Sequence, residues 1–232
     1  MTNPTTRRTW RLGRLAPLAG AGAAVLTVAG DLVIGPYLDS DVPASRVTTY
    51  YSTHHTHVLA ASVLFTYAAV LFAVFGAALW ARLRRAALHP MVEGLALVAT
   101  AVATAGDLAN AGSWYVLGDL GGKHTISAAA LQSFHIMVSA AIFPAAAGAG
   151  VLLVAVGAGG IAASAFPRWV AWSALLVGLA QLVPTPGTVG FLLGLVLLVW
   201  MLATGIALAI RADDGTPLAE RAESGAALPA MR

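Results

Sequence analysis

The chain contains no cysteine, which excludes disulfides, thiolate metal sites, iron–sulfur clusters and thiol catalysis. Charge is also scarce: Asp, Glu, Lys and Arg make up 10% of its 232 residues, against about 25% in an average soluble domain. No catalytic signature of a known reaction type is present. Any metal or haem site would therefore depend on histidine and carboxylate ligands.

Hydrophobic residues are abundant instead, at 59% of the chain, and the mean hydropathy is +0.80. A helix needs about 20 predominantly apolar residues to cross the hydrocarbon core of a membrane. The absence of an alternating pattern argues against a transmembrane barrel. The sequence therefore predicts an all-α polytopic bundle of six transmembrane helices, at about 15–36, 58–81, 91–117, 126–157, 168–184 and 189–210.

The distribution of basic residues predicts orientation, because short cytoplasmic loops collect Lys and Arg. Eleven of the thirteen basic residues fall on one side of such a bundle, and only Arg46 and Lys123 fall on the other. We expect a multi-pass protein of the cell membrane with both termini cytoplasmic. The net charge of +3 then reflects topology in a lipid bilayer and requires no nucleic-acid partner.

Three regions follow from this reading. Residues 1–14 form a basic cytoplasmic N-terminus, and residues 15–210 form the six-helix transmembrane domain. Residues 211–232 are polar and rich in small residues, so we expect a disordered cytoplasmic tail.

A repeat of polar residues lies within the apolar sequence. The motif AGDL at 29–32 returns at 105–108, a shift of 76, and 57–65 matches 135–143 with a shift of 78. The transmembrane domain is thus predicted to consist of three hairpins, of which the first two are a parallel internal repeat. The hairpins span about 15–82, 91–157 and 168–210.

Each repeat supplies one aspartate and one histidine inside a predicted span. If the third span ends near 117 and the fourth begins near 126, Asp107 and His135 lie at one depth, about 14–15 Å below the outer surface. His54 and Gln132 lie three positions before His57 and His135 and share their helix faces. A third, weaker similarity, of 179–183 to 29–33, places Gln181 at the position of the aspartate. We predict an outer-side intramembrane pocket of seven side chains: Asp31, His57, Asp107, His135, His54, Gln132 and Gln181.

Ionised carboxylates are costly in hydrocarbon and usually pair inside the bundle. Imidazoles oriented by carboxylates are ligands for metals and haem iron, and two histidines at one depth suit a bis-histidine haem. The first functional hypothesis is therefore metal or haem binding, or redox chemistry, with haem b, Zn²⁺ or Cu²⁺ as candidate cofactors. The candidate ligands are His54, His57, His135, Asp31 and Asp107.

Other functions stay open, and so does the question of whether the protein is an enzyme. The same Asp–His couples could carry protons in a small-solute transporter, or take part in hydrolysis within the membrane. They could instead only fix helix register in a non-catalytic scaffold or accessory protein. A separate candidate metal site is the histidine-rich segment 54–57 together with Asp39 and Asp41.

The last third of the chain carries a resemblance. Its motifs are FPRWVAW at 166–172, a glycine-containing apolar span, and LVP at 182–184. Together with the aspartates of the first and third spans, they resemble a group of six-helix membrane proteins of actinobacteria, over about residues 15–210. No reaction is assigned to that group, so the resemblance implies fold and membrane location only.

Overall fold

The computed structural model describes residues 4–39, 41–86, 88–123, 126–183 and 188–211, and only the backbone over 4–14. Within these ranges all regular structure is helical, in six helices: α1 (Pro4–Ile34), α2 (Ala44–Arg85), α3 (Pro90–Lys123), α4 (Ala128–Ala163), α5 (Arg168–Gln181) and α6 (Thr188–Arg211). The all-helical prediction is confirmed, and five helices are long and apolar enough to span a membrane. The tail expected at 211–232 lies, beyond Arg211, outside the described residues.

Helix α5 is the exception among the six. It has 14 residues, about 21 Å at the helical rise, whereas the hydrocarbon core is about 30 Å thick. The helix ends at Gln181, three residues before Pro184, and a proline disfavours helical conformation in the residue that precedes it. The segment predicted to span the membrane over 168–184 is therefore too short to do so as a helix.

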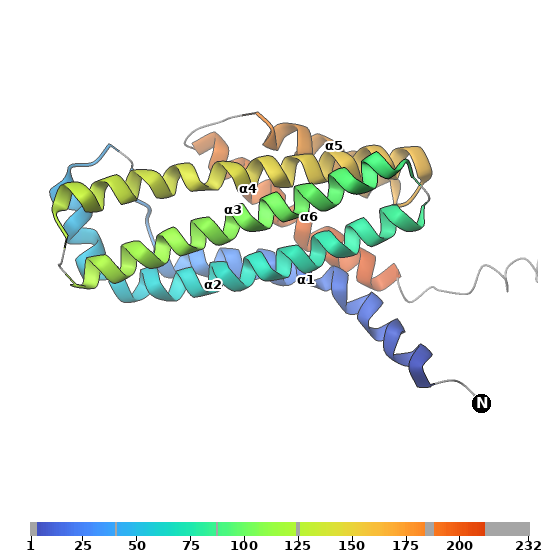
Figure 1. Cartoon of the computed structure of the whole chain (residues 1–232), viewed down its shortest axis with the longest axis horizontal. Helices are drawn as coiled ribbons and strands as arrows, with labels where there is room; N and C mark the ends of the chain where they lie inside the picture. Colours follow the sequence, from blue (N-terminus) through green and yellow to red (C-terminus); the bar gives the residue numbers. More distant parts are fainter. Residues whose placement is uncertain (1–3, 40, 87, 124–125, 184–187, 212–232) are drawn as a thin grey trace, which may run out of the picture.

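The first four helices pack in chain order, α1 on α2, α2 on α3 and α3 on α4. Figure 1 shows α2, α3 and α4 side by side along the bundle, with α6 crossing behind them. Helix α5 packs on α4 and α6 packs on α1, while α5 and α6 touch each other only slightly. The predicted third hairpin is thus splayed, because its two helices pack on different partners.

The glycines of the two AGDL motifs mark close approaches between helices. A Cβ added to Gly30 would overlap the ring of Phe65 on α2, and one added to Gly106 would lie 2.5 Å from the backbone nitrogen of Ala145 on α4. Small residues at such crossings let membrane helices pack backbone to backbone. The aspartate that follows each glycine is therefore held next to a helix contact.

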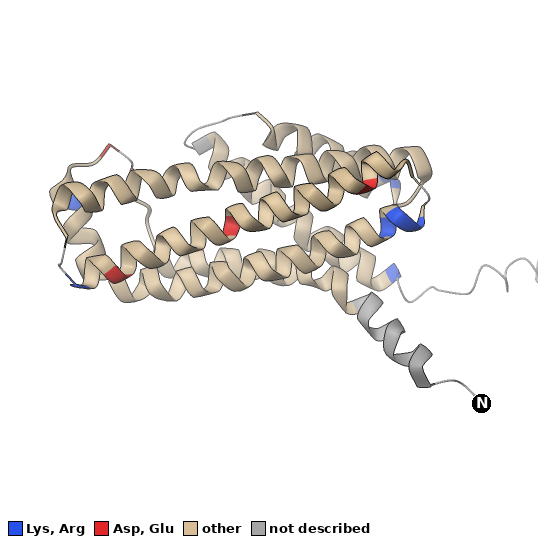
Figure 2. Ribbon diagram, in the orientation of Figure 1, with Lys and Arg blue, Asp and Glu red and all other residues tan. Residues whose placement is uncertain are grey.

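Figure 2 shows the basic positions toward the two ends of the bundle, whereas an acidic position also lies midway along α3. At one end, named here the arginine-rich end, Arg82 donates a hydrogen bond of 3.1 Å to the Leu208 carbonyl and so caps the last turn of α6. The connection between α1 and α2, residues 35–39 and 41–43, lies at the opposite end and is named here the cap. Near the cap end, Lys123 pairs with Asp119 at 2.7 Å.

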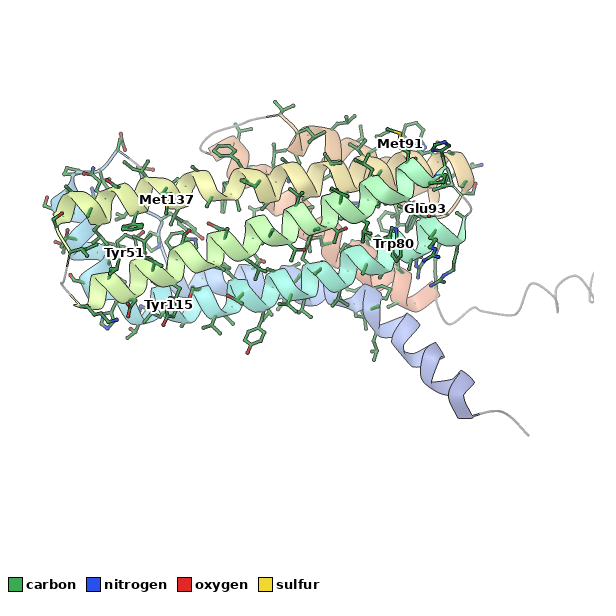
Figure 3. The ribbon with its side chains drawn as sticks, viewed as in Figure 1. Tyr51, Trp80, Met91, Glu93, Tyr115 and Met137 are labelled. Carbon is green, nitrogen blue, oxygen red and sulfur yellow. The ribbon has the colours of Figure 1, made fainter. Side chains whose placement is uncertain are left out.

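Two clusters of buried apolar side chains form the core. The larger lies toward the arginine-rich end and includes Phe75 and Trp200, whose rings meet at 6.1 Å. The smaller lies toward the cap end and includes Ile34 and Tyr51. Figure 3 shows Tyr51 and Trp80 near opposite ends of the bundle. The division of the core leaves space between the clusters.

Candidate functional site

A cavity of about 620 Å³ lies between the two clusters and is lined by residues of all six helices. Small-molecule sites typically enclose about 300–1,000 Å³ and are mostly apolar. The walls of this cavity are likewise mostly apolar, and five of the lining side chains carry a phenyl or indole ring: Phe65, Phe72, Trp114, Phe143 and Phe191. The cavity is large enough for a drug-sized molecule.

The cavity brings together part of the predicted pocket. Four of the seven predicted side chains line it: Asp31 from α1, Asp107 from α3, His135 from α4 and Gln181 from α5. Three do not: His54, His57 and Gln132. The second repeat therefore supplies both its predicted aspartate, Asp107, and its predicted histidine, His135, to the cavity, whereas the first supplies only its aspartate, Asp31.

Asp107 and His135 line the same cavity but do not share one depth. Helix α3 continues to Lys123, beyond the expected end near 117, and Gly106 faces Ala145 across the α3–α4 contact. Asp107 is therefore level with the part of α4 that lies about nine residues after His135, or roughly 14 Å along the axis. The expected single layer of acids and imidazoles is wrong because the predicted helix end was misplaced.

His135 is buried, at 3% exposure, and both of its ring nitrogens have partners. Nε2 lies 3.2 Å from the backbone oxygen of Asp39, so it donates, and Nδ1 shares a hydrogen bond of 2.9 Å with the hydroxyl of Tyr51. Because both nitrogens are engaged, neither is available to a metal ion or to haem iron.

The two carboxylates have different surroundings. Asp31 Oδ1 accepts a hydrogen bond of 2.5 Å from the hydroxyl of Tyr37, in place of the expected partner His57. Burial, and secondly this hydrogen bond, raise the pKa of Tyr37 above its usual value, so the hydroxyl remains a donor. Asp107 lies deep in the bundle and lines the cavity, and no hydrogen bond to its carboxylate is formed by the described residues.

The histidines of α2 do not complete a metal site. His57 is exposed, and its ring centroid lies 6.2 Å from that of His54, which stacks on Tyr50 and bonds its carbonyl at 3.0 Å. Because α2 begins at Ala44, segment 54–57 is helical, and His55 points away from the face that His54 and His57 share.

The predicted metal ligands are consequently not assembled. Within the part of the chain that the structure describes, no three His, Asp or Glu side chains form a group that could hold a metal ion. This finding applies both to the set of His54, His57, His135, Asp31 and Asp107 and to segment 54–57 with Asp39 and Asp41. A bis-histidine haem b does not fit either, because one imidazole is exposed and the other is fully hydrogen-bonded.

The cap closes one end of the cavity and is fastened by side chains of α2 and α4. Gln132 donates to the Val42 carbonyl at 2.9 Å, and His135 donates to the cap at Asp39. Tyr50 donates to the carbonyl of Ile34, just before the cap, at 3.0 Å. Tyr37 and Leu38 of the cap themselves line the cavity, which is therefore covered at the cap end.

The cavity is open in another direction, toward the lateral surface between α4 and α6. Lining residues of these two helices are largely exposed: Phe143 is 50% exposed and Phe191 is 53% exposed. Helices α4 and α6 make hardly any contact in the described ranges, and α5 ends at Gln181, whose side chain donates to the Leu193 carbonyl of α6 at 2.9 Å. The opening therefore faces the region that lipid occupies in a membrane.

Some residues of the site were missed by sequence reasoning. Asn110 lines the cavity three residues after Asp107, a spacing that places both on one helix face and could have been recognised. Tyr37 and Tyr51, which bond Asp31 and His135, carry no comparable signal, because Tyr51 and its partner are 84 residues apart. Contacts of this kind depend on tertiary packing.

No protein-family model, no curated protein and no solved structure shows a significant match to the chain. A function can therefore be inferred from the cavity and its lateral opening.

Proposed function

We propose that this protein binds a small, largely apolar molecule within the membrane, and that the molecule reaches its site from the lipid phase between α4 and α6. The observation that carries this proposal is the cavity of about 620 Å³, which is covered at the cap end and open on the lateral surface. Its mostly apolar wall favours an apolar ligand, since burial of apolar surface drives such binding.

Two routes into the cavity can be compared, one from water at the cap end and one from lipid between α4 and α6. Access from water at the cap end would require the hydrogen bonds from Gln132 and His135 to the cap to break. Access from lipid requires only that a molecule pass between α4 and α6, where the lining residues Phe143 and Phe191 are exposed. The lateral route therefore has the lower barrier for a molecule already dissolved in the bilayer.

We also propose that the arginine-rich end faces the cytoplasm, with both chain ends on that side. The described basic residues support this orientation, because the ends of α2 and α6 and the start of α5 carry arginines there, and positive residues favour the cytoplasmic side. The cap would then face outward. The similar glycine contacts of the two AGDL motifs support a duplicated hairpin as the origin of the first four helices.

The binding proposal can be tested with a neutral fluorescent probe, N-(3,3-dimethylbutyl)dansylamide, and purified protein in lipid nanodiscs. Trp114 lines the cavity, so a bound dansyl group should accept energy from tryptophan, and the signal should saturate. Ala146→Phe places a ring in the cavity from α4 and should weaken binding roughly tenfold, or about 1.4 kcal/mol.

The matched control is Ala158→Phe, which makes the same change at an exposed position of α4 outside the cavity lining. Its affinity should equal that of the unaltered protein. A signal that rises linearly with probe, as in protein-free nanodiscs, or one that both variants change equally, would disprove an intramembrane binding site.

A further inference from the structure

We infer that the ligand of this site is a lipophilic cation: an apolar or aromatic body that carries one ammonium or comparable positively charged centre. This inference rests on the proposed function and specifies the chemistry of the same cavity.

The first support is the charge of the lining. Two acidic side chains, Asp31 and Asp107, line the cavity, and no Lys or Arg does so among the described residues. Among the arginines of α2, Arg46 is exposed in the first turn near the cap and does not line the cavity. The next, Arg82, lies ten residues or about 15 Å beyond the lining residue Phe72 and bonds the Leu208 carbonyl. The carboxylates therefore face a cavity without a compensating cationic side chain.

The second support is the unpaired state of Asp107. Its carboxylate is held beside the backbone contact of Gly106 with Ala145, and it receives no hydrogen bond from any described residue. Buried acids in membrane proteins normally pair, because an unpaired charge in a medium of low dielectric constant is costly. A ligand cation would provide the missing partner.

The third support is that His135 is paired with neither acid. Its Nε2 donates to the Asp39 carbonyl and its Nδ1 shares a hydrogen bond with the Tyr51 hydroxyl, so both ring nitrogens are engaged away from the two carboxylates. His135 therefore provides no partner for Asp31 or Asp107.

The fourth support is the arrangement of acids and aromatic rings. Asp31 follows Gly30, which faces Phe65 of α2, and the α2–α3 contacts place Asp107 about five residues further along α2, roughly 8 Å along the axis. Next to Asp31, the rings of Tyr37 and Trp114 meet at 5.7 Å. Aromatic faces combined with carboxylates bind quaternary ammonium groups through cation–π and ionic attraction.

The test uses two isosteric probes that differ only in charge. One is the neutral N-(3,3-dimethylbutyl)dansylamide, and the other is N-(2-trimethylammonioethyl)dansylamide, in which a quaternary nitrogen replaces a carbon. Asp107→Asn and Asp31→Asn should each weaken binding of the cationic probe by roughly tenfold, the effect expected for one partly desolvated charge pair. Each change should affect binding of the neutral probe much less than binding of the cationic probe, and saturable binding of the neutral probe also reports that each variant is folded.

Asp119→Asn is the matched control, because Asp119 is on the same helix as Asp107 but pairs with Lys123 outside the cavity. It should leave both affinities unchanged. Saturable binding of the neutral probe with no effect of Asp31→Asn or Asp107→Asn on the cationic probe would overturn the cation inference and leave the apolar site intact. An equal loss for both probes, or failure of the cationic probe to saturate, would also overturn it, whereas failure of the neutral probe to saturate would refute the proposed function itself.

Discussion

Replacement of Gly106 by alanine is expected to destabilise the protein more than its small size suggests. The added methyl carbon would lie 2.5 Å from the backbone nitrogen of Ala145 and 2.8 Å from its Cα. Backbone atoms cannot rotate away as a side chain can, so α3 and α4 must separate. Overpacking of this kind costs about 1–3 kcal/mol.

The same helix contains a matched control. Gly112 is also in α3, and a Cβ built there meets nothing within 4 Å. Alanine has a higher helix propensity than glycine by up to ~1 kcal/mol, so Gly112→Ala should be neutral or slightly stabilising. Because the gain in helix propensity is common to both substitutions, they should differ by the overpacking cost, about 1–3 kcal/mol in the free energy of unfolding.

Unfolding of both variants by sodium dodecyl sulfate in mixed micelles, followed by circular dichroism, would measure this difference. Because Asp107 follows Gly106 directly, separation of α3 from α4 should also weaken binding of the cationic dansyl probe. If Gly106→Ala were as stable as Gly112→Ala, the close α3–α4 contact that positions Asp107 would be refuted.

Three further predictions follow from individual contacts. Tyr51→Phe leaves a buried imidazole nitrogen unpaired, so the protein should lose about 1–3 kcal/mol of stability and the amide hydrogens of the cap should exchange faster. Tyr67→Phe is the control, because Tyr67 is 61% exposed, and it should change neither stability nor exchange. Arg82→Ala should speed proteolysis at the end of α6, while Arg84→Ala, which is exposed, should not. Addition of Zn²⁺ should change the thermal unfolding temperature equally in the unaltered protein and in the His57→Ala variant. A larger rise in the unaltered protein would contradict the geometry described for the α2 histidines.

Much of the fold could be predicted from hydropathy. Long apolar runs in a chain with few charges can hide their backbone groups from lipid only as helices, so the number of helices followed from the positions of these runs. The glycines of the two AGDL motifs also had a readable meaning, because small residues in a span indicate close helix packing. The number of helices and the role of these glycines can be recognised from local sequence and from the properties of a membrane, without knowledge of tertiary contacts.

The depth of the site residues could not be predicted in the same way. Hydropathy locates the part of a helix that suits hydrocarbon, and it does not locate the end of the helix. Helix α3 continues past 117 through Asp119 to Lys123, and α2 begins at Ala44, fourteen residues before its expected start. The extension of α3 moves Asp107 and His135 apart along the axis. The hydrogen-bond partners of His135 and Asp31 come from Tyr51 and the cap, which no local pattern indicates.

The length of α5 connects this fold to its proposed function. A helix that continued about six residues past Gln181 would cross the whole hydrocarbon core and could fill the space beside α4, as an ordinary third hairpin would. Instead α5 stops, α6 packs on α1, and the side chains of Phe143 and Phe191 border a gap that opens toward lipid. The two aspartates of the AGDL motifs, on α1 and α3, line the cavity beside this gap. A short, splayed hairpin thus leaves a cavity exposed on the lateral surface, where a full-length hairpin would have covered it.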